Sequence, residues 1–257
     1  MSSYVAPPAS VVHIPRAARS PAFSPLYRQI KDSMLRALGE KEWTPGMMIP
    51  SETELAARFG VSQGTVRKAI DELASENLLV RCQGKGTFVA SHCDPHAYYR
   101  FLRLQPDDGA SLQSRHSTPL SCGEIPAEKI VAQALRIETG APVILLERLL
   151  DFGDEAVVFD QIFLAADIFS GLTLERLQQG DQSLYSLLES GFGVRMIRAE
   201  ERLRAVSDAY AARRLRLPEA NPLLLVERLT YTYDDRPVEW RRGFYHTARH
   251  HYRNDLS

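Results

Sequence analysis

Cysteine is scarce in this chain, and no apolar segment is long enough to cross a membrane. The three cysteines among 257 residues are Cys82, Cys93 and Cys122. They form no Cys-x-x-Cys pair, and an odd number cannot pair completely, so a disulfide framework is not expected. The first 22 residues contain several prolines and no continuous apolar core, which is not the pattern of a signal peptide. We therefore expect a reduced, cytoplasmic protein with no membrane partner.

Motifs of common catalytic sites are also missing. The glycine-rich segment 84–87 lacks the upstream glycine and the directly following Ser or Thr of a phosphate-binding loop. No Gly-x-Ser-x-Gly or zincin motif occurs. His92, Cys93 and His96 lie close together, but without a second cluster they do not predict a metal site, nor does the histidine pair at 250–251. We expect no enzymatic activity, no cofactor and no metal.

The chain carries no excess of positive charge, because 31 Lys and Arg residues are balanced by 32 Asp and Glu residues. Net charge therefore does not indicate binding to nucleic acid, and such a function must depend on where the cations lie. The composition, 44% hydrophobic and 25% charged, is typical of a globular protein. A chain of this length has room for two ordinary domains.

Residues 50–76 predict two helices joined by a tight turn. Ser51 and Glu54 have the spacing of a capping box, which begins the first helix. Gly60 suits the left-handed conformation that ends a helix, and Ser62 is placed to cap the second one. The inward stripe of that second helix is predicted to be Val66, Ile70 and Leu73. An earlier helix is expected to begin at Ser24 and Pro25 and to end at residues 43–46.

The outer side of the second helix carries small polar residues, an amide and cations. Gln and Arg side chains can contact base edges, whereas Ser, Thr and helix N-terminal amides bind phosphates. Apolar runs at 79–82 and 87–89 flank a glycine-rich cationic tip, which predicts a β-hairpin. Two helices and a basic-tipped hairpin make a winged helix-turn-helix, with Arg81 among the gathered cations. The candidate DNA-binding residues are Thr53, Ser62, Gln63, Gly64, Thr65, Arg67, Lys68, Gly84 and Lys85.

The segments 50–56, 60–62, 65–67 and 84–89 together resemble the DNA-binding domain of GntR-type bacterial repressors. The resemblance covers about residues 24–90 and implies binding to double-stranded DNA. The alternative is a winged helix used only for protein contacts. The exposed face argues against it, because it is basic and has no apolar patch.

The second half contains an internal repeat with an offset of 80 residues, in which 142–149 matches 222–229. A helical run precedes each copy, at 127–135 and 207–215, and an acidic turn and another strand follow. Two such units can merge their strands into one mostly antiparallel sheet with helices on one side. Residues 183–189 predict a short helix between the units, and 194–204 a further strand.

The segments 142–148, 183–185, 236–239 and 243–245 are similar in order and spacing to the UTRA effector-binding domain of the HutC branch of GntR regulators. This resemblance implies a fold like that of chorismate lyase, and therefore an α+β protein overall. We expect a disordered arm over 1–22, the winged helix over 23–91, a linker over 92–100, and an effector-binding and dimerisation domain over 101–257.

Strand alternation places Arg148 and Leu150 on one face, and Glu239, Arg241 and Tyr245 on one face of the last strand. Buried charged groups need partners, which can be a ligand or an internal salt bridge. The UTRA resemblance implies that the effector-binding positions are Arg148, Leu150, Asp160, Ser183, Tyr185, Glu239 and Tyr245. Ser183 could instead be only a helix N-cap, and Arg228, the repeat equivalent of Arg148, is expected to be structural.

Taken together, these features predict a homodimeric transcriptional regulator, in the simplest case a repressor, that binds a palindromic operator. Its effector is expected to be a small organic acid. Leu150 stands where relatives that bind phosphorylated sugars have a second cation, which disfavours a sugar phosphate. The alternatives are a lyase-like enzyme that carries a winged helix, and a metal sensor.

Overall fold

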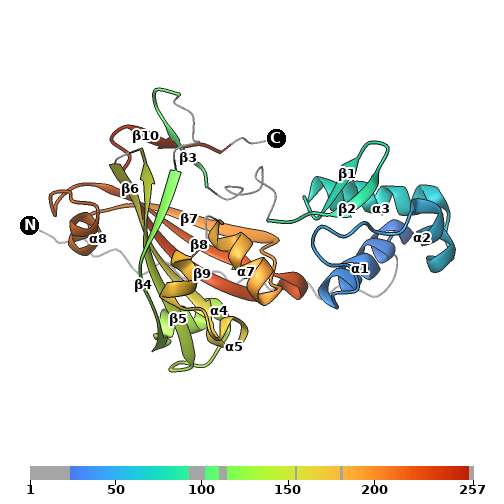
Figure 1. The fold of residues 1–257 in the computed structure, drawn as a ribbon, viewed down its shortest axis with the longest axis horizontal. Coiled ribbons are helices and arrows are strands. Elements are labelled where there is room, and N and C mark those ends of the chain that lie inside the picture. The colour runs from blue at the N-terminus through green and yellow to red at the C-terminus, as the bar shows by residue number, and fades with distance from the viewer. Residues whose placement is uncertain (1–23, 93–101, 110–114, 154, 180–181, 255–257) are drawn as a thin grey trace, which may run out of the picture.

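The computed structural model describes residues 24–92, 102–109, 115–153, 155–179 and 182–254. The arm predicted over 1–22 and most of the predicted linker lie outside these residues. Figure 1 shows a small helical unit with a two-stranded wing beside a larger unit built on a sheet. The order of elements is α+β, as predicted.

The small unit is a winged helix-turn-helix. It contains α1 (Leu26–Gly39), α2 (Glu52–Phe59), α3 (Gln63–Ser75) and the hairpin of β1 (Leu79–Cys82) and β2 (Gly86–Val89). The predicted capping box is present, since Ser51 accepts from the backbone of Glu54 and the Glu54 side chain accepts from the backbone of Ser51. Gly60 ends α2 with a φ of 66°. The core of this unit is formed by residues including Met34, Leu55, Val66, Ile70 and Leu73.

Both ends of α1 differ from the prediction. The N-cap position is occupied by Pro25, and no side chain caps it, so Ser24 does not have the predicted role. The helix ends at Gly39 rather than at 43–46, because Lys41 adopts a φ of 62° and reverses the chain. The segment that was expected to end the helix instead pairs with the wing, where the Gly46 amide donates to the Val89 carbonyl at 2.9 Å.

The large unit contains a six-stranded sheet with the order β4-β5-β6-β9-β8-β7. All its pairings are antiparallel. Its strands are β4 (Arg115–Pro126), β5 (Pro142–Phe152), β6 (Glu155–Ala165), β7 (Arg198–Val206), β8 (Leu223–Tyr231) and β9 (Pro237–Tyr245). The sequence repeat explains this order, because β4-β5-β6 and β7-β8-β9 are equivalent units that meet at β6 and β9. Arg136 and Arg216, 80 residues apart, both adopt a left-handed φ after the helix of their unit.

Helices cover both faces of this sheet, so the prediction of helices on one side was wrong. On one face, α5 (Ala166–Phe169), α6 (Leu174–Gln178) and α7 (Leu184–Phe192) cover Leu146 and Ile162. On the other face, α4 (Lys129–Leu135) packs on Trp240, and α8 (Ala209–Arg214) packs on Phe159 and Phe244. The reason is strand alternation. Successive residues of the buried strands are apolar on both sides, and each side requires a cover.

The remaining elements are short. β3 (Leu104–Pro106) pairs with β10 (His250–Tyr252) in a two-stranded sheet that was not predicted. A 3-10 turn, η3 (Tyr233–Asp235), joins β8 to β9 at the predicted acidic turn. β7 begins four residues later than predicted, at Arg198. Among the helices of the described ranges, none combines the length and the apolar character needed to cross a bilayer.

Candidate DNA-binding face and effector site

The first turn of α3 presents an exposed polar surface. Ser62 caps the helix by accepting from the Thr65 amide, and its Oγ lies 2.9 Å from the Thr65 hydroxyl. Ser62, Gln63, Gly64, Arg67 and Lys68 are all exposed. The positive end of the helix dipole and its unpaired N-terminal amides therefore face solvent, which is the arrangement that binds a phosphate. Thr53 on α2 is also exposed.

One carboxylate, that of Glu52, organises this surface. Its Oε2 lies 2.9 Å from Nε and 2.8 Å from Nη2 of Arg67, and it accepts from Gln63 at 3.3 Å. Its Oε1 lies 3.3 Å from Arg81 Nη1 on the wing. The hydrogen bond from Arg67 is the main reason why the pKa of Glu52 is lowered. Glu52 thus links α2, α3 and the wing, and binds the guanidinium of the exposed Arg67 through two of its nitrogens.

The other two predicted DNA-binding cations, Lys68 and Lys85, have different surroundings. The Lys68 ammonium lies 4.0 Å from the centre of the Tyr27 ring, a cation–π contact. Lys85 is exposed at the tip of the wing, between Gly84 (φ 72°) and Gly86 (φ 122°). A Cβ at position 86 would lie 3.1 Å from Met48 Sδ, so the glycine allows Met48 to approach the wing closely. The exposed position of Lys85 at the tip suits a contact with a DNA backbone.

In the large unit, four of the predicted effector residues lie in one buried charge network. Arg148 Nε donates to Asp160 Oδ2 at 2.9 Å, and Arg241 Nη1 lies 3.3 Å from the same oxygen. Arg241 Nε also donates to Glu239 Oε1 at 2.7 Å, and the Tyr185 hydroxyl donates to that oxygen at 3.3 Å. Arg241, which was not among the predicted effector residues, is therefore the centre that connects them. The internal salt bridge weighed from the sequence is present.

Two oxygen atoms of this network still have capacity to accept hydrogen bonds. Within the described residues, Asp160 Oδ1 and Glu239 Oε2 are buried and have no hydrogen-bond partner. Buried acceptors normally have a partner, so each exception calls for an explanation. Two guanidinium groups, of Arg148 and Arg241, are matched by these two carboxylates. The two oxygens therefore have the chemistry to accept from N–H or O–H groups.

The other three predicted residues have different surroundings. Ser183 is the N-cap of α7 and accepts from the Ser186 amide at 3.2 Å. Leu150 is buried in an apolar cluster with Leu104, Val157 and Tyr245. Burial raises the pKa of the Tyr245 hydroxyl to about 12, so the phenol is neutral at physiological pH. Ser183 thus has the structural role that was considered for it, and Leu150 contributes to the core of this face.

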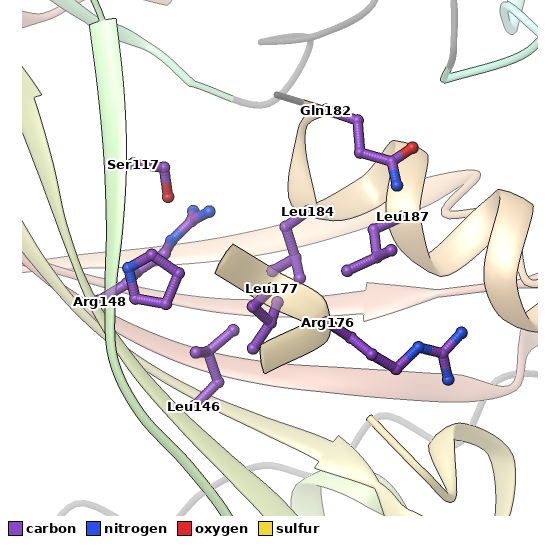
Figure 2. Close-up of a pocket in the computed structure, with 9 residues that line it drawn as sticks. Ser117, Leu146, Arg148, Arg176, Leu177, Gln182, Leu184 and Leu187 are labelled. Atoms are coloured by element: carbon purple, nitrogen blue, oxygen red, sulfur yellow. The ribbon is translucent and has the colours of Figure 1, made fainter. Parts of the chain in front are cut away.

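A small cavity opens beside Arg148, between β4, β5 and the helices α6 and α7. Its volume is about 40 Å³, enough for about three water molecules. It is lined by Ser117, Pro119, Leu146, Arg148, Arg176, Leu177, Gln182, Leu184 and Leu187. Figure 2 shows the Arg148 guanidinium directed toward Ser117, whereas the Arg176 side chain extends away from both residues. Of the predicted effector residues, only Arg148 lines this cavity.

Sequence reasoning missed Glu52, Arg241 and the leucines of the cavity. Glu52 precedes Arg67 by 15 residues and lies on another helix, so no spacing rule connects the two. Arg241 was placed on the correct face by strand alternation, but its role depends on neighbouring strands. The leucines of α6 and α7 have the pattern of ordinary core residues. The signal in the sequence for a ligand site was Arg148 on a strand otherwise rich in apolar residues.

Comparison with known proteins gives matches in both units. The model of the UTRA domain matches residues 113–251, more than half of the chain. The model described as "Bacterial regulatory proteins, gntR family" matches residues 26–89. These two segments are the sheet unit and the winged helix.

Three individual proteins illustrate the similarity. The crystal structure of the ligand-binding domain of a GntR-family transcriptional regulator from Bordetella bronchiseptica is 43% identical, with a TM-score of 0.60, and covers 62% of this chain and 99% of that domain. The transcriptional repressor NagR of Bacillus subtilis is 26% identical over 91% of this chain and 96% of its own length. The histidine utilization repressor of Klebsiella aerogenes is 36% identical over 47% of this chain and 50% of its own length.

Proposed function

Because the chain belongs to the gntR family of bacterial regulatory proteins and carries a UTRA domain, we propose that it is a dimeric repressor whose operator binding is controlled by a small organic acid. It is a transcriptional regulator and not an enzyme, so the lyase-like alternative is set aside. NagR and the histidine utilization repressor are both described as repressors, which supports this sign of regulation. The observation that carries the proposal is the combination of an exposed recognition helix with a buried arginine network beside a cavity.

The operator would be bound by α3 in the major groove and by the wing at the backbone. Arg67 is the candidate for reading a base edge, because its side chain is exposed on α3 and Glu52 holds its guanidinium in place. Ser62, Thr65 and the amides of the first turn are placed to hold a phosphate. Lys85 adds a phosphate contact that depends on salt and not on sequence.

A homodimer is proposed because two winged helices related by a two-fold axis read an inverted repeat. Residues 101–257 are the proposed dimerisation and effector domain. A fragment of residues 1–92 should fold and bind a half-site weakly, because it lacks the effective concentration that linkage to a second module provides. Equal affinity of the fragment and the full chain for a palindrome would show that the second domain is not the dimeriser.

The proposed effector has one acidic group, a partly apolar body and at least one hydrogen-bond donor. Arg148 presents a planar, permanently charged group suited to a carboxylate. Leu146, Leu184 and Leu187 offer apolar surface next to it. Asp160 and Glu239 can accept from hydroxyl, amine or amide groups of the ligand, and they would repel a heavily anionic compound. Leu150 supplies no second cation, which disfavours a sugar phosphate.

Two steps test this function. Selection from a random DNA library with the full chain should enrich an inverted repeat, whereas enrichment of an asymmetric site or of none would contradict the dimeric repressor.

A thermal-shift screen of small organic acids should then give a stabilising compound. Arg148→Lys keeps the charge beside Asp160 but loses the planar fork, and should remove most of that shift. Arg213→Lys is the matched control, because Arg213 pairs with Glu219 at an exposed position and does not line the cavity, and it should respond like the wild type.

A further inference from the structure

An arginine of the effector domain, Arg195, donates hydrogen bonds to the backbone at the C-terminal end of α3, the proposed recognition helix. Arg195, in the short segment between α7 and β7, is 3% exposed. Its Nη2 donates to the Asn77 carbonyl at 2.7 Å and its Nη1 to the Leu78 carbonyl at 3.2 Å. These carbonyls follow directly on the end of α3, where the helix dipole is negative, so a guanidinium there is favourable. The contact fixes the end of α3 that lies opposite its DNA-binding first turn.

A second set of hydrogen bonds joins the effector domain to Ser91 and His92, which follow the wing in the chain. Glu189, near the end of α7, is 5% exposed. Its carboxylate accepts from the His92 amide, at 3.0 Å and 3.2 Å for its two oxygens, and from the Ser91 hydroxyl. The His92 ring is 1% exposed and its Nε2 lies 3.0 Å from the Met196 carbonyl. Glu189 also lies 3.8 Å from Arg195, so the two sets of hydrogen bonds form one cluster, which we call the interdomain clasp (Glu189, Arg195, Ser91 and His92).

Apolar contacts also join the two domains beside the clasp. Ile197 and Tyr233 of the effector domain pack against the core of the winged helix. Position 39, at the end of α1, is so close to Tyr233 that a Cβ there would lie 3.4 Å from the Tyr233 Cβ. A buried ion pair breaks only at a high free-energy cost, because each charge would be left without a partner. The clasp therefore holds the two domains in one defined relative orientation.

We propose that Arg195 and Glu189 are positioning residues for operator recognition, because the clasp sets the orientation of α3 relative to the dimerising domain and so the half-site separation that the protein accepts. This inference rests on the proposed dimer. In a symmetric dimer, the distance between two recognition helices must match a defined number of base pairs. A helix anchored at one end by buried hydrogen bonds has one such distance, whereas a helix on a free tether would accept several.

The clasp also shares a helix with the cavity. Leu184 and Leu187 of α7 line the cavity, and Glu189 lies two residues further along the same helix. Tyr185, between them, joins the buried charge network and lies with its ring 5.5 Å from the His92 ring. An acid bound beside Arg148 would contact Leu184 and Leu187, and a shift of α7 on binding would move Glu189.

A spacing series of the selected palindrome tests the inference. Its two half-sites are kept constant and the central spacer is varied from several base pairs shorter to several longer. Full-length wild type should prefer one spacing by about tenfold or more, since a misplaced half-site loses the gain in avidity. Arg195→Ala and Glu189→Gln should each reduce this preference to less than about threefold, with affinity for a single half-site unchanged within about twofold. Arg195→Lys, which keeps the charge but not the paired donors, should be intermediate.

The control is Arg213→Ala, which removes an exposed pair with Glu219 on α8, away from the clasp, and should keep the wild-type preference. Retention of the preference in folded Arg195→Ala and Glu189→Gln would overturn the inference and leave the dimer proposal intact. A wild-type protein that binds all spacings equally would overturn both. Loss of half-site affinity in Glu189→Gln equal to the loss at the best spacing would also overturn the inference, because it would indicate a purely structural role.

Discussion

Arg148 and Asp160 face each other across β5 and β6, with Nη2 of the arginine 2.8 Å from Oδ2 of the aspartate. Asp160 is fully buried and Arg148 is nearly so. Breaking a buried pair by removing one partner costs about 3–5 kcal/mol. Because Arg241 also contacts Asp160, we expect Arg148→Ala to destabilise the effector domain by about 3 kcal/mol, at the lower end of this range.

Urea unfolding of full-length protein measures this loss. The double variant Arg148→Met, Asp160→Asn should recover part of it, since neither charge is then left unpaired. An unchanged midpoint in Arg148→Ala would show that the pair contributes nothing to the fold. The effect also explains why Arg148→Lys is the better variant for ligand experiments.

Arg67→Ala should weaken operator binding by about 1–3 kcal/mol, because it removes a candidate base contact and leaves the Glu52 carboxylate facing the DNA. Fluorescence-polarisation titration of the selected palindrome would measure the change. Loss of affinity for the palindrome should exceed the loss for unrelated DNA. Equal losses on both would reassign Arg67 to a phosphate.

Lys85→Ala should weaken binding to all DNA sequences. For each Lys85 that contacts a phosphate, the slope of log affinity against log salt concentration should become shallower by roughly one unit. The wing tip should keep its shape, because Gly84 and Gly86 supply the backbone conformation without the lysine side chain. Titrations at several salt concentrations would detect the change. A slope equal to that of wild type would show that the wing does not touch the backbone.

Cys122 reports on the packing of β4 under α6. Burial raises the pKa of its thiol to about 11, so the group is almost entirely protonated at pH 8. Since the thiolate is the reactive form, alkylation at pH 8 should be about a hundredfold slower in the folded chain than in urea. The thiol of the folded state keeps its proton to a higher pH than the thiol of the unfolded state. The contribution of Cys122 to folding stability therefore falls as pH rises from about 9 to about 11. Peptide-resolved labelling would measure the rate, and equal rates in both states would contradict the packing.

The winged helix could be predicted almost completely from the sequence. Capping and turn signals act within a few positions, so Ser51, Gly60 and Ser62 defined the ends of α2 and the start of α3. The 80-residue repeat predicted one merged, mostly antiparallel sheet, but the strand β4 and the order of the strands were not predicted. The end of α1 was not predicted, because a left-handed residue after a helix is usually Gly or Asn, whereas here it is Lys41, with a φ of 62°.

The sites were predicted less completely, for a physical reason. Strand alternation identified the face of Arg148 and Glu239, but a partner on a neighbouring strand depends on register. In β5 and β6 the register includes a shift between Leu150 and Asp151. The covering of both sheet faces depends on where the crossover helices pack, and the contacts of Arg195 join segments more than 100 residues apart.

The central claim is that operator and acid bind to coupled sites, and one titration tests it most directly. Operator affinity of full-length protein is measured with and without a saturating amount of the acid found by thermal shift. We predict that the acid weakens operator binding by roughly fivefold or more, and that operator weakens acid binding by the same factor, as linkage requires. If the acid binds and shifts the melting temperature, yet operator affinity stays within about twofold, the chain is not an acid-controlled repressor.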